Sequence, residues 1–372
     1  MRTRVLYLIS SLAQGGAERH LLELVRCLDT RRFEPVIAVL RPDLHYREDG
    51  APARIVLGSG SWPAARGRLI TTLRAVRPAI VHCYLNDGNL WGRLATQLAP
   101  GRRPRVLTSV HLDDMSLFYR GAERLLRRAS DRIVAHSESI RRLLVDRLQI
   151  PSQAVQVIAN GVDTTRFRPP TDLERERARH ELAFTRGELV AVMPARLCAQ
   201  KNQTGVLAAL GQLRAAGHLP RAFRLVLAGR VSSQVVLQQI RFAIWRHRLD
   251  AHVQLAGPVA DVKRLLWAAD VALLPSLTEA SPLAALEAMA TGLPLALTHA
   301  SNTDRVLVDS EHGWELADHR PGTIADALYR VFTTSRAQRI AMGSRARAHV
   351  EANFLVRRVA DDFQRLYAQL AS

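Results

Sequence analysis

Short, continuously apolar runs alternate with longer amphipathic stretches over almost the whole chain. Strands that are apolar at every position are buried on both faces, and such burial is typical of parallel sheets covered by helices on both sides. Strand-like runs that alternate with helical patterns favour the same architecture. We therefore predict an α/β fold built from doubly wound parallel sheets.

The apolar runs fall into two sets, which predicts two domains, and a length of 372 residues suits that number. The first set is Val5–Ile9, Pro35–Leu40, Ile80–Tyr84, Arg105–Val110, Arg132–Ala135 and Val155–Ile158. The second set is Leu189–Pro194, Arg224–Ala228, Val253–Ala256, Val271–Pro275 and Leu293–Leu297. We place the boundary just after Asn160–Asp163, so that residues 1–165 form the first domain and residues 166–354 the second.

Composition excludes several classes of protein. Apolar residues make up 48% and charged residues 23%, which is typical of soluble domains and not of disordered or fibrous chains. Three widely spaced cysteines argue against a disulfide framework or a zinc site. No apolar run reaches the ~18 residues that span a bilayer, and the apolar start is too short for a signal peptide. We expect a cytoplasmic protein with at most peripheral contact with the inner face of the plasma membrane.

The formal net charge of +18 calls for an anionic partner. Residues 1–170 contain 27 Arg against 15 Asp and Glu, so most of the surplus lies in the first domain. Two basic helical stretches there, one with Trp62 and Arg66 and one with Arg124 and Arg128, suit an anionic membrane surface, although an ordinary solvated face explains each as well. Nucleic acid is disfavoured as a partner, because aromatic residues are only 5% and no binding module is evident.

A glycine pair follows the first predicted strand. Gly15 and Gly16 precede a predicted helix that opens at Ala17. A strand, a glycine turn and a helix N-terminus can hold a phosphate, because the backbone approaches closely and the helix dipole favours an anion. An ordinary tight turn explains the two glycines equally well.

Two cations, Arg196 and Lys201, lie in the loop after the predicted strand Leu189–Pro194. Ligands of open α/β sheets bind at the carboxyl ends of strands, and an Arg with a Lys suits a pyrophosphate. Lys201 is one of only two lysines beside 50 arginines, and this rarity favours a functional role over a solvated loop.

The strongest signal is the segment Glu279–Pro294. Ser281 is predicted to cap a helix that begins at Pro282 and stops at Gly292. Glu287 is the only charge inside that helix, and its neighbours are small or apolar. A carboxylate buried in this way needs a partner, which is either a ligand hydroxyl or an internal Arg.

Histidine and the acidic residues do not indicate a metal centre. His111 follows the predicted strand Arg105–Val110, at another strand end, and by itself a packed or surface histidine is the ordinary explanation. No cluster with metal-ligand spacing is evident in the sequence.

Taken together, the motifs resemble those of the retaining, nucleotide-sugar-dependent glycosyltransferases of family 4. The motifs, in the family's order, are Gly15-Gly16-Ala17-Glu18-Arg19, Asn160-Gly161-Val162-Asp163, Arg196 with Lys201, and Glu279 with Glu287. The resemblance implies the GT-B fold, with two Rossmann-like domains facing across a cleft and a final helix, residues 355–372, packed back on the first domain. It implies retaining transfer from a UDP- or GDP-linked sugar to an acceptor hydroxyl in polysaccharide, glycolipid or cell-envelope biosynthesis.

The resemblance also implies roles for single residues. His111 would be the active-site histidine, Arg196 and Lys201 would neutralise the pyrophosphate, and Glu279 would hold donor-sugar hydroxyls. Glu287 would bind the ribose. The other donor-binding positions implied are Gly15, Gly16, Val259, Ser281, Pro282, Leu283 and Ala284. No metal or other cofactor is implied, and the partners would be a nucleotide-sugar donor and a lipid-linked or saccharide acceptor.

Two segments depart from the family pattern. Gly229-Arg230-Val231 stands where relatives often have Gly-Asp-Gly, and Ser301-Asn302-Thr303-Asp304 where many have two glycines and a glutamate. The donor base and sugar therefore stay open. Two alternative functions are a sugar-nucleotide epimerase with the same fold and a basic nucleic-acid- or membrane-binding protein without catalysis.

Overall fold

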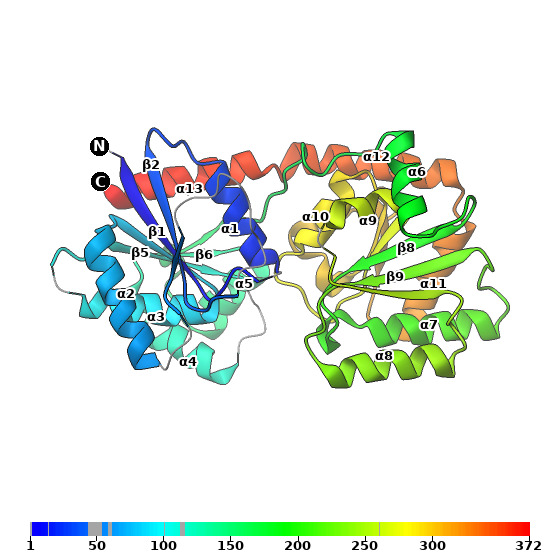
Figure 1. The fold of residues 1–372 in the computed structure, drawn as a ribbon, viewed down its shortest axis with the longest axis horizontal. Coiled ribbons are helices and arrows are strands. Elements are labelled where there is room, and N and C mark those ends of the chain that lie inside the picture. Colours follow the sequence, from blue (N-terminus) through cyan, green and yellow to red (C-terminus); the bar gives the residue numbers. More distant parts are fainter. Residues whose placement is uncertain are drawn as a thin grey trace. The chain divides into compact units, whose positions relative to one another are not determined.

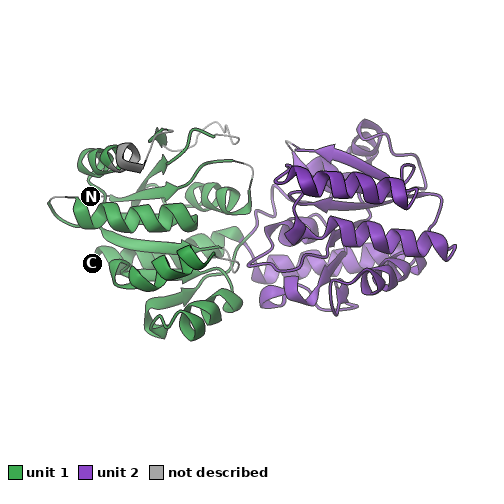
Figure 2. Ribbon diagram, turned by 90° about the horizontal axis from the view of Figure 1, so that it is seen from below, with its two compact units in different colours: residues 1–161, 356–372 green, residues 162–355 purple. Residues whose placement is uncertain are grey.

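The structure, a computed structural model, describes residues 2–13, 15–43, 54–58, 62–99, 101–111, 116–259 and 261–372, with only the backbone of residues 62–66. The chain forms two compact units (Figure 2). Unit 1 comprises residues 1–161 and 356–372, and unit 2 comprises residues 162–355. Within the described residues, no helix is long and apolar enough to cross a membrane.

Unit 1, which contains the strands labelled β1, β2, β5 and β6 in Figure 1, is built on a parallel sheet. This sheet has seven strands in the order β3-β2-β1-β4-β5-β6-β7. Its strands are β1 Thr3–Ile9, β2 Phe33–Val39, β3 Arg54–Val56, β4 Ile80–Tyr84, β5 Arg105–Val110, β6 Arg132–Ala135 and β7 Val155–Val157. Its helices include α1 Gly16–Arg26, α2 Trp62–Val76, α3 Leu85–Leu98, α4 Leu117–Leu125, α5 Glu138–Arg142 and α13 Val356–Ala371. The strand order reverses between β1 and β4, which is where ligands of such sheets bind.

Unit 2 is built on a six-stranded parallel sheet in the order β10-β9-β8-β11-β12-β13. Its strands are β8 Leu189–Pro194, β9 Phe223–Ala228, β10 Val253–Gly257, β11 Val271–Leu274, β12 Leu295–Thr298 and β13 Gly313–Leu316. Its helices include α6 Asp172–Glu181, α7 Gln203–Ala215, α8 Gln234–Arg246, α9 Val262–Ala268, α10 Leu283–Ala290, α11 Pro321–Thr333 and α12 Arg336–Asn353. The order reverses between β8 and β11.

Helices cover both faces of the sheet in unit 2. One buried cluster joins α7, α8 and α11 to the sheet, and a second joins α9, α10 and α12 to the opposite face. The prediction of doubly wound parallel sheets is therefore confirmed. Each of the eleven predicted apolar runs corresponds to a strand, with ends that differ by at most two residues.

The C-terminal helix α13 packs in unit 1. Phe363 and Tyr367 are buried with the core residues of β1 and β4. The Tyr367 hydroxyl lies 2.7 Å from Nδ1 of His82, and the backbone N–H of Asp29 donates to Oε1 of Gln364 at 2.9 Å. These polar contacts fix the position of α13 in unit 1 more specifically than apolar packing alone would.

A buried ion pair fixes α4 on α3. Arg93 of α3 is fully buried, and its guanidinium donates to the carboxylate of Glu123, which is 3% exposed. Nε of Arg93 also donates to the backbone oxygen of Asn89 at 2.8 Å. Because both charges have left water, each depends on the other to offset its loss of hydration.

We predict that Glu123→Ala destabilises unit 1 by about 3–5 kcal/mol, because it leaves the buried guanidinium of Arg93 without its counter-charge. Replacing both partners with apolar residues, in Arg93→Met with Glu123→Leu, restores most of the loss. Urea unfolding measures both variants. A single variant as stable as the parent, or a double variant less stable than the single one, would contradict this prediction.

Candidate functional site

The loops that follow β8 and β11 are bound to each other at the point where the strand order reverses. The backbone N–H of Leu277 donates to the carbonyl of Gln200 at 2.8 Å, and Nε2 of Gln200 donates to the carbonyl of Thr278 at 3.1 Å. Nδ2 of Asn202 donates to the carbonyl of Pro275 at 3.2 Å. The two loops therefore form one polar surface at the carboxyl edge of the sheet.

Lys201 and Glu279 form an ion pair across these two loops. Nζ of Lys201 donates to Oε1 of Glu279, which also accepts from Oγ of Ser276 at 2.7 Å. The side chains of the Lys and the Glu are only 16% and 9% exposed. Both residues were predicted from the sequence to belong to the site, and the structure brings them together.

Arg196 also lies in the loop after β8, but its side chain is exposed, unlike that of Lys201. Its backbone carbonyl accepts from Nε2 of Gln203 at 2.8 Å, which fixes the loop. Its guanidinium is exposed and makes no ion pair with any described residue. A cation with this freedom can reach an anionic ligand without first giving up another partner.

The helix α10 begins one residue later than we predicted. Pro282 has a ψ of 87°, which is not helical, so it is the N-cap and Leu283 is the first helical residue. The prediction that Ser281 caps the helix and Pro282 opens it is therefore wrong. The predicted stop is confirmed, since Gly292 takes a φ of +79°, a conformation that glycine adopts readily.

The N-terminus of α10 offers backbone donors beside the ion pair. The N–H groups of Ala285 and Leu286 donate to the carbonyl of Pro282. Among the hydrogen bonds of the described residues, none uses the N–H groups of Leu283 or Ala284. Helix N-termini of this kind bind anions, because the free N–H groups and the helix dipole act together.

Two further predicted donor-binding residues lie in or against the core of unit 2. Glu287, on α10, is 4% exposed. Val259 is partly buried and packs on the same hydrophobic cluster as α10. Neither position contradicts the predicted roles, which stay predictions.

In unit 1, α1 begins at Gly16, and Gly15 is its N-cap in an extended conformation. A Cβ at Gly15 would lie 2.3 Å from a carboxylate oxygen of Glu18, so the absent side chain leaves room for that carboxylate. An acidic group in the first turn is favourable to the helix dipole. The same N-terminus would favour a phosphate for the same reason.

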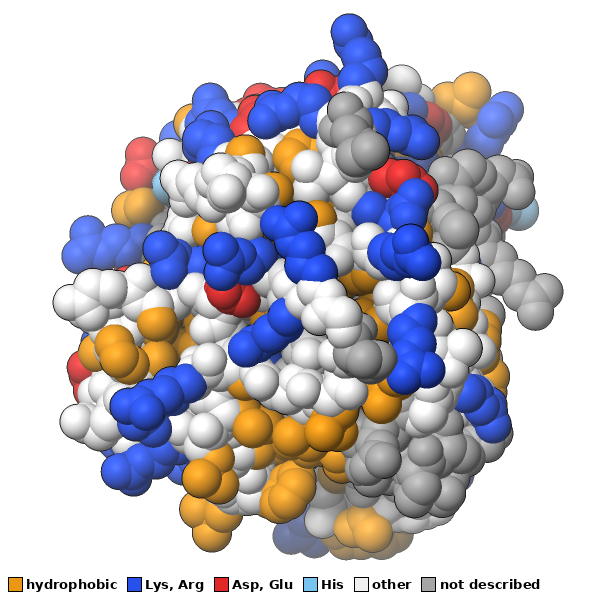
Figure 3. Space-filling model, turned by 90° about the vertical axis from the view of Figure 1, so that its left-hand side faces the viewer, with side chains coloured by type: hydrophobic (Ala, Val, Ile, Leu, Met, Phe, Trp, Pro, Cys, Tyr) orange, Lys and Arg blue, Asp and Glu red, His pale blue; other side chains and the backbone are white. Residues whose placement is uncertain are grey.

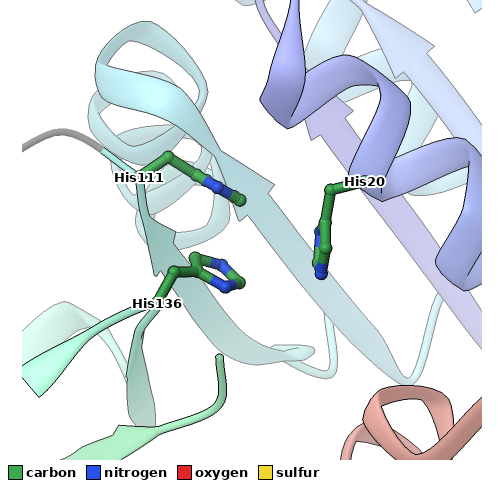
Figure 4. A group of neighbouring side chains, drawn as sticks. All are labelled: His20, His111 and His136. Carbon is green, nitrogen blue, oxygen red and sulfur yellow. The ribbon is translucent and has the colours of Figure 1, made fainter. Parts of the chain in front are cut away.

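His111 belongs to a group of three histidines in unit 1 (Figure 4). His20 reaches from α1 toward His111 and His136, which directly follow the neighbouring strands β5 and β6. The rings of His111 and His136 stack with centroids 3.8 Å apart and planes 20° apart. The ring of His20 lies 4.8 Å from that of His136 and 5.5 Å from that of His111.

The three imidazoles are held in their neutral form. Burial lowers the pKa of His20 to about 4, and burial with neighbouring histidines lowers the pKa of His111 and of His136 well below the usual value. Protonation of one ring would create a cation in a buried environment, beside two other imidazoles that can also be protonated. The group therefore contains neutral nitrogen donors and acceptors at physiological pH.

His20 and His136 were not predicted from the sequence to belong to a site. A signal was present for His136, because it follows its strand by one residue as His111 does, and Val110 pairs with Ala135 in the sheet. The position of His20 gave no comparable signal, since its contact with the other rings depends on the angle at which α1 crosses the sheet.

We predict that acid destabilises unit 1 between pH 6.5 and about pH 4. An unfolded histidine takes up a proton near pH 6.5, whereas folded His20 does so only near pH 4, so stability is complete above pH 6.5 and falls below it. The difference for His20 alone corresponds to about 3 kcal/mol.

Urea unfolding at pH 7.5 and pH 4 measures this loss, and His20→Leu reduces it. An equal loss in parent and variant would show that His20 is not the cause.

Both halves of the chain match known protein families. Residues 14–166 match the family described as Glycosyltransferase Family 4, and residues 174–349 match Glycosyl transferases group 1. One curated relative, the putative glycosyltransferase EpsD of Bacillus subtilis, is 29% identical over 245 residues. That match covers 63% of this chain and 62% of the relative, which is less than two thirds of its length.

A second relative matches over more of the chain. The UDP-Gal:alpha-D-GlcNAc-diphosphoundecaprenol alpha-1,3-galactosyltransferase of Escherichia coli is 24% identical over 311 residues, which cover 81% of this chain and 78% of the relative. Several D-inositol 3-phosphate glycosyltransferases also match, over about half of their own length, for example 27% identity over 49% of the enzyme from Corynebacterium kroppenstedtii.

Solved structures share the fold. Anabaena HepE, in complex with UDP and glucose, superposes with a TM-score of 0.86 at 18% identity, over 99% of this chain and 100% of HepE. WaaG, a glycosyltransferase involved in lipopolysaccharide biosynthesis, gives a TM-score of 0.77 at 15% identity, over 96% of this chain and 99% of WaaG.

Proposed function

Because the chain belongs to the family 4 glycosyltransferases and has their GT-B fold, we propose that it transfers a sugar from a nucleotide diphosphate to an acceptor hydroxyl with retention of the anomeric configuration. The observation that carries this proposal is the Lys201–Glu279 pair, placed where the strand order of unit 2 reverses and beside the free N–H groups of α10.

The diphosphate of the donor binds at Lys201 and at the N-terminus of α10. The ammonium of Lys201 turns from Glu279 to a phosphate oxygen, and the N–H groups of Leu283 and Ala284 donate to the same group. Glu279 then has a free oxygen, which accepts hydrogen bonds from donor-sugar hydroxyls. The exposed guanidinium of Arg196 adds a second cation.

These groups stabilise the charge that develops when the sugar–phosphate bond breaks. Donors that are already in place at the leaving group need no reorganisation during the reaction, and loss of one such donor costs roughly 3–4 kcal/mol in known enzymes. We propose that the cations and the helix N-terminus take the place of a metal ion at the diphosphate, and that His111 of unit 1 is the active-site histidine.

The donor is proposed to be a UDP-sugar. HepE, with the same fold, is described with UDP and with UDP-glucose, and the E. coli relative is named for UDP-Gal. That relative acts on a sugar linked to diphosphoundecaprenol, which supports a lipid-linked acceptor here and a role in cell-envelope polysaccharide or glycolipid synthesis.

The direct test incubates the protein with UDP-sugars and a diphosphoundecaprenol-linked sugar, and NMR then defines the product. The proposal expects a new glycoside with the donor's anomeric configuration and one UDP released per transfer. It also expects an undiminished rate in the presence of a chelator. An epimerised nucleotide sugar without a glycoside would establish the epimerase alternative instead, and an inverted glycoside would refute retention.

We predict that Lys201→Ala and Glu279→Ala each lower turnover by about 100-fold or more, since each removes a group that contacts the donor. Lys263→Ala is a matched control, because Lys263 is the only other lysine and lies against the Trp267 ring, 4.7 Å from its centroid. Steady-state kinetics of the three folded variants measure the effect. Parental rates in both site variants would refute the assignment.

A basic and apolar surface on α4 fits a membrane-bound acceptor. Leu117, Phe118 and Leu125 are 84%, 66% and 82% exposed. Arg124, which is also on α4, and Arg128, three residues after its end, are exposed as well. On the face drawn in Figure 3, Lys and Arg side chains are spread widely with few acidic ones between them. Such a surface binds anionic lipid by apolar insertion and by charge. The side chains of Trp62 and Arg66, in the other predicted basic stretch, lie outside the described residues.

We predict that Arg124→Gln with Arg128→Gln weakens binding to anionic phospholipid vesicles roughly 30-fold, because each basic residue near the surface contributes about 1 kcal/mol. Arg214→Gln with Arg221→Gln removes the same charge from exposed positions of unit 2 and serves as the control. Vesicle co-sedimentation compares them. Equal losses in both pairs would attribute binding to net charge and not to α4.

A further inference from the structure

Three imidazoles from three separate elements converge in unit 1. His20 comes from α1, His111 from the end of β5 and His136 from the end of β6. One ligand-type nitrogen from each ring lies within 4.8 Å of the corresponding nitrogen of the other two. His20 and His136 are fully buried. Among the described residues, no other group of three or more such side chains comes together in this way.

Most of the ring nitrogens in this group have no hydrogen-bond partner. Both nitrogens of His20 and Nε2 of His111 are buried without one. For His136, the Ile158 backbone lies close enough to favour the charged form of the ring, and the other ring nitrogen is buried without a partner. His82, a buried histidine of the same unit, differs, because its nitrogens lie 2.7 Å from the Tyr367 hydroxyl and 2.8 Å from Oγ of Ser109. Each unsatisfied buried polar group costs about 1–3 kcal/mol, so the group of three calls for a ligand.

We propose that His20, His111 and His136 bind a divalent transition-metal ion of the zinc class, each through one imidazole nitrogen. Neutral imidazole is a preferred ligand of Zn²⁺, Co²⁺, Ni²⁺ and Cu²⁺, and not of Mg²⁺ or Ca²⁺. Three histidines that leave a fourth position open are a known arrangement for zinc. The Ile158 backbone is positioned to accept from the second nitrogen of His136, as carbonyls do behind metal-bound histidines.

Binding requires a change in ring orientation that the test can detect. The rings of His111 and His136 are stacked nearly parallel, whereas nitrogens that share one ion point toward it in the planes of their own rings. One ring therefore turns about its Cβ–Cγ bond when the ion binds. A cobalt spectrum reports both the ligation and the resulting geometry.

The proposed metal site is separate from the proposed diphosphate site, and a ligand bound there has a different effect. It lies in unit 1, whereas Lys201, Glu279 and the N-terminus of α10 lie in unit 2. An ion bound here engages the lone pair of His111, so loading inhibits sugar transfer; this consequence, unlike the binding itself, rests on the proposed function. A failure of metal binding leaves the proposed function unaffected.

Titration of the metal-free full chain with Co²⁺ tests the site. The proposal expects one equivalent bound per chain, with the visible absorption bands of a four-coordinate Co²⁺ that has three nitrogen ligands, and it expects Zn²⁺ to displace the Co²⁺. We expect His20→Leu and His136→Leu each to weaken Co²⁺ binding by more than roughly 10–100-fold, which is the cost of losing a hydrogen-bond partner behind a metal ligand. Leu keeps most of the buried volume, and thermal unfolding confirms that the variants fold.

His349→Ala is the matched control, because it removes one ring from the His312–His349 pair of unit 2, whose centroids are 4.6 Å apart. Binding that persists in this control and is lost in both variants of the group supports the site. No stoichiometric binding by the parent, unchanged binding in the two variants of the group, or loss in the control overturns it.

Discussion

The ion pair between Lys201 and Glu279 is the interaction on which the proposed chemistry depends. It joins the loops after β8 and β11, which are neighbours in the sheet. The strand order reverses between them, because β9 and β10 lie on one side of this pair and β12 and β13 on the other. Both side chains are largely buried, so each charge needs the other while no ligand is bound. An incoming diphosphate can replace Glu279 as the partner of Lys201, and this exchange converts a structural pair into a binding site.

Much of the fold could be predicted because parallel strands buried on both faces leave an unmistakable apolar pattern. The strands that escaped prediction are β3, which has only three residues and begins with Arg54, and β13, where Gly313 and Glu315 interrupt the pattern. Both are edge strands, and β3 is in addition only partly buried, so it needs fewer apolar residues. The start of α10 was misplaced because Pro282 is compatible with either the N-cap or the first helical turn, and its ψ decides between them.

The site could be predicted only where residues follow adjacent strands. Lys201 and Glu279 meet because β8 and β11 are neighbours, so the order of the strands brings their loops together. The contact of His20 with His111 and His136 depends on how a helix lies over the sheet, which no local pattern encodes. The same distinction explains Arg93 and Glu123, whose burial as a pair follows from the packing of α4 on α3 and not from sequence spacing.

The most direct test of the central claim is a thermal-shift comparison of UDP-, GDP- and ADP-sugars on the parent protein and on Lys201→Ala. A ligand present at 100 times its dissociation constant stabilises a protein by about 2.7 kcal/mol. The proposed site predicts that UDP-sugars raise the unfolding temperature of the parent, and that the same concentration has little effect on Lys201→Ala. No stabilisation by any nucleotide sugar, or equal stabilisation of parent and variant, would contradict it.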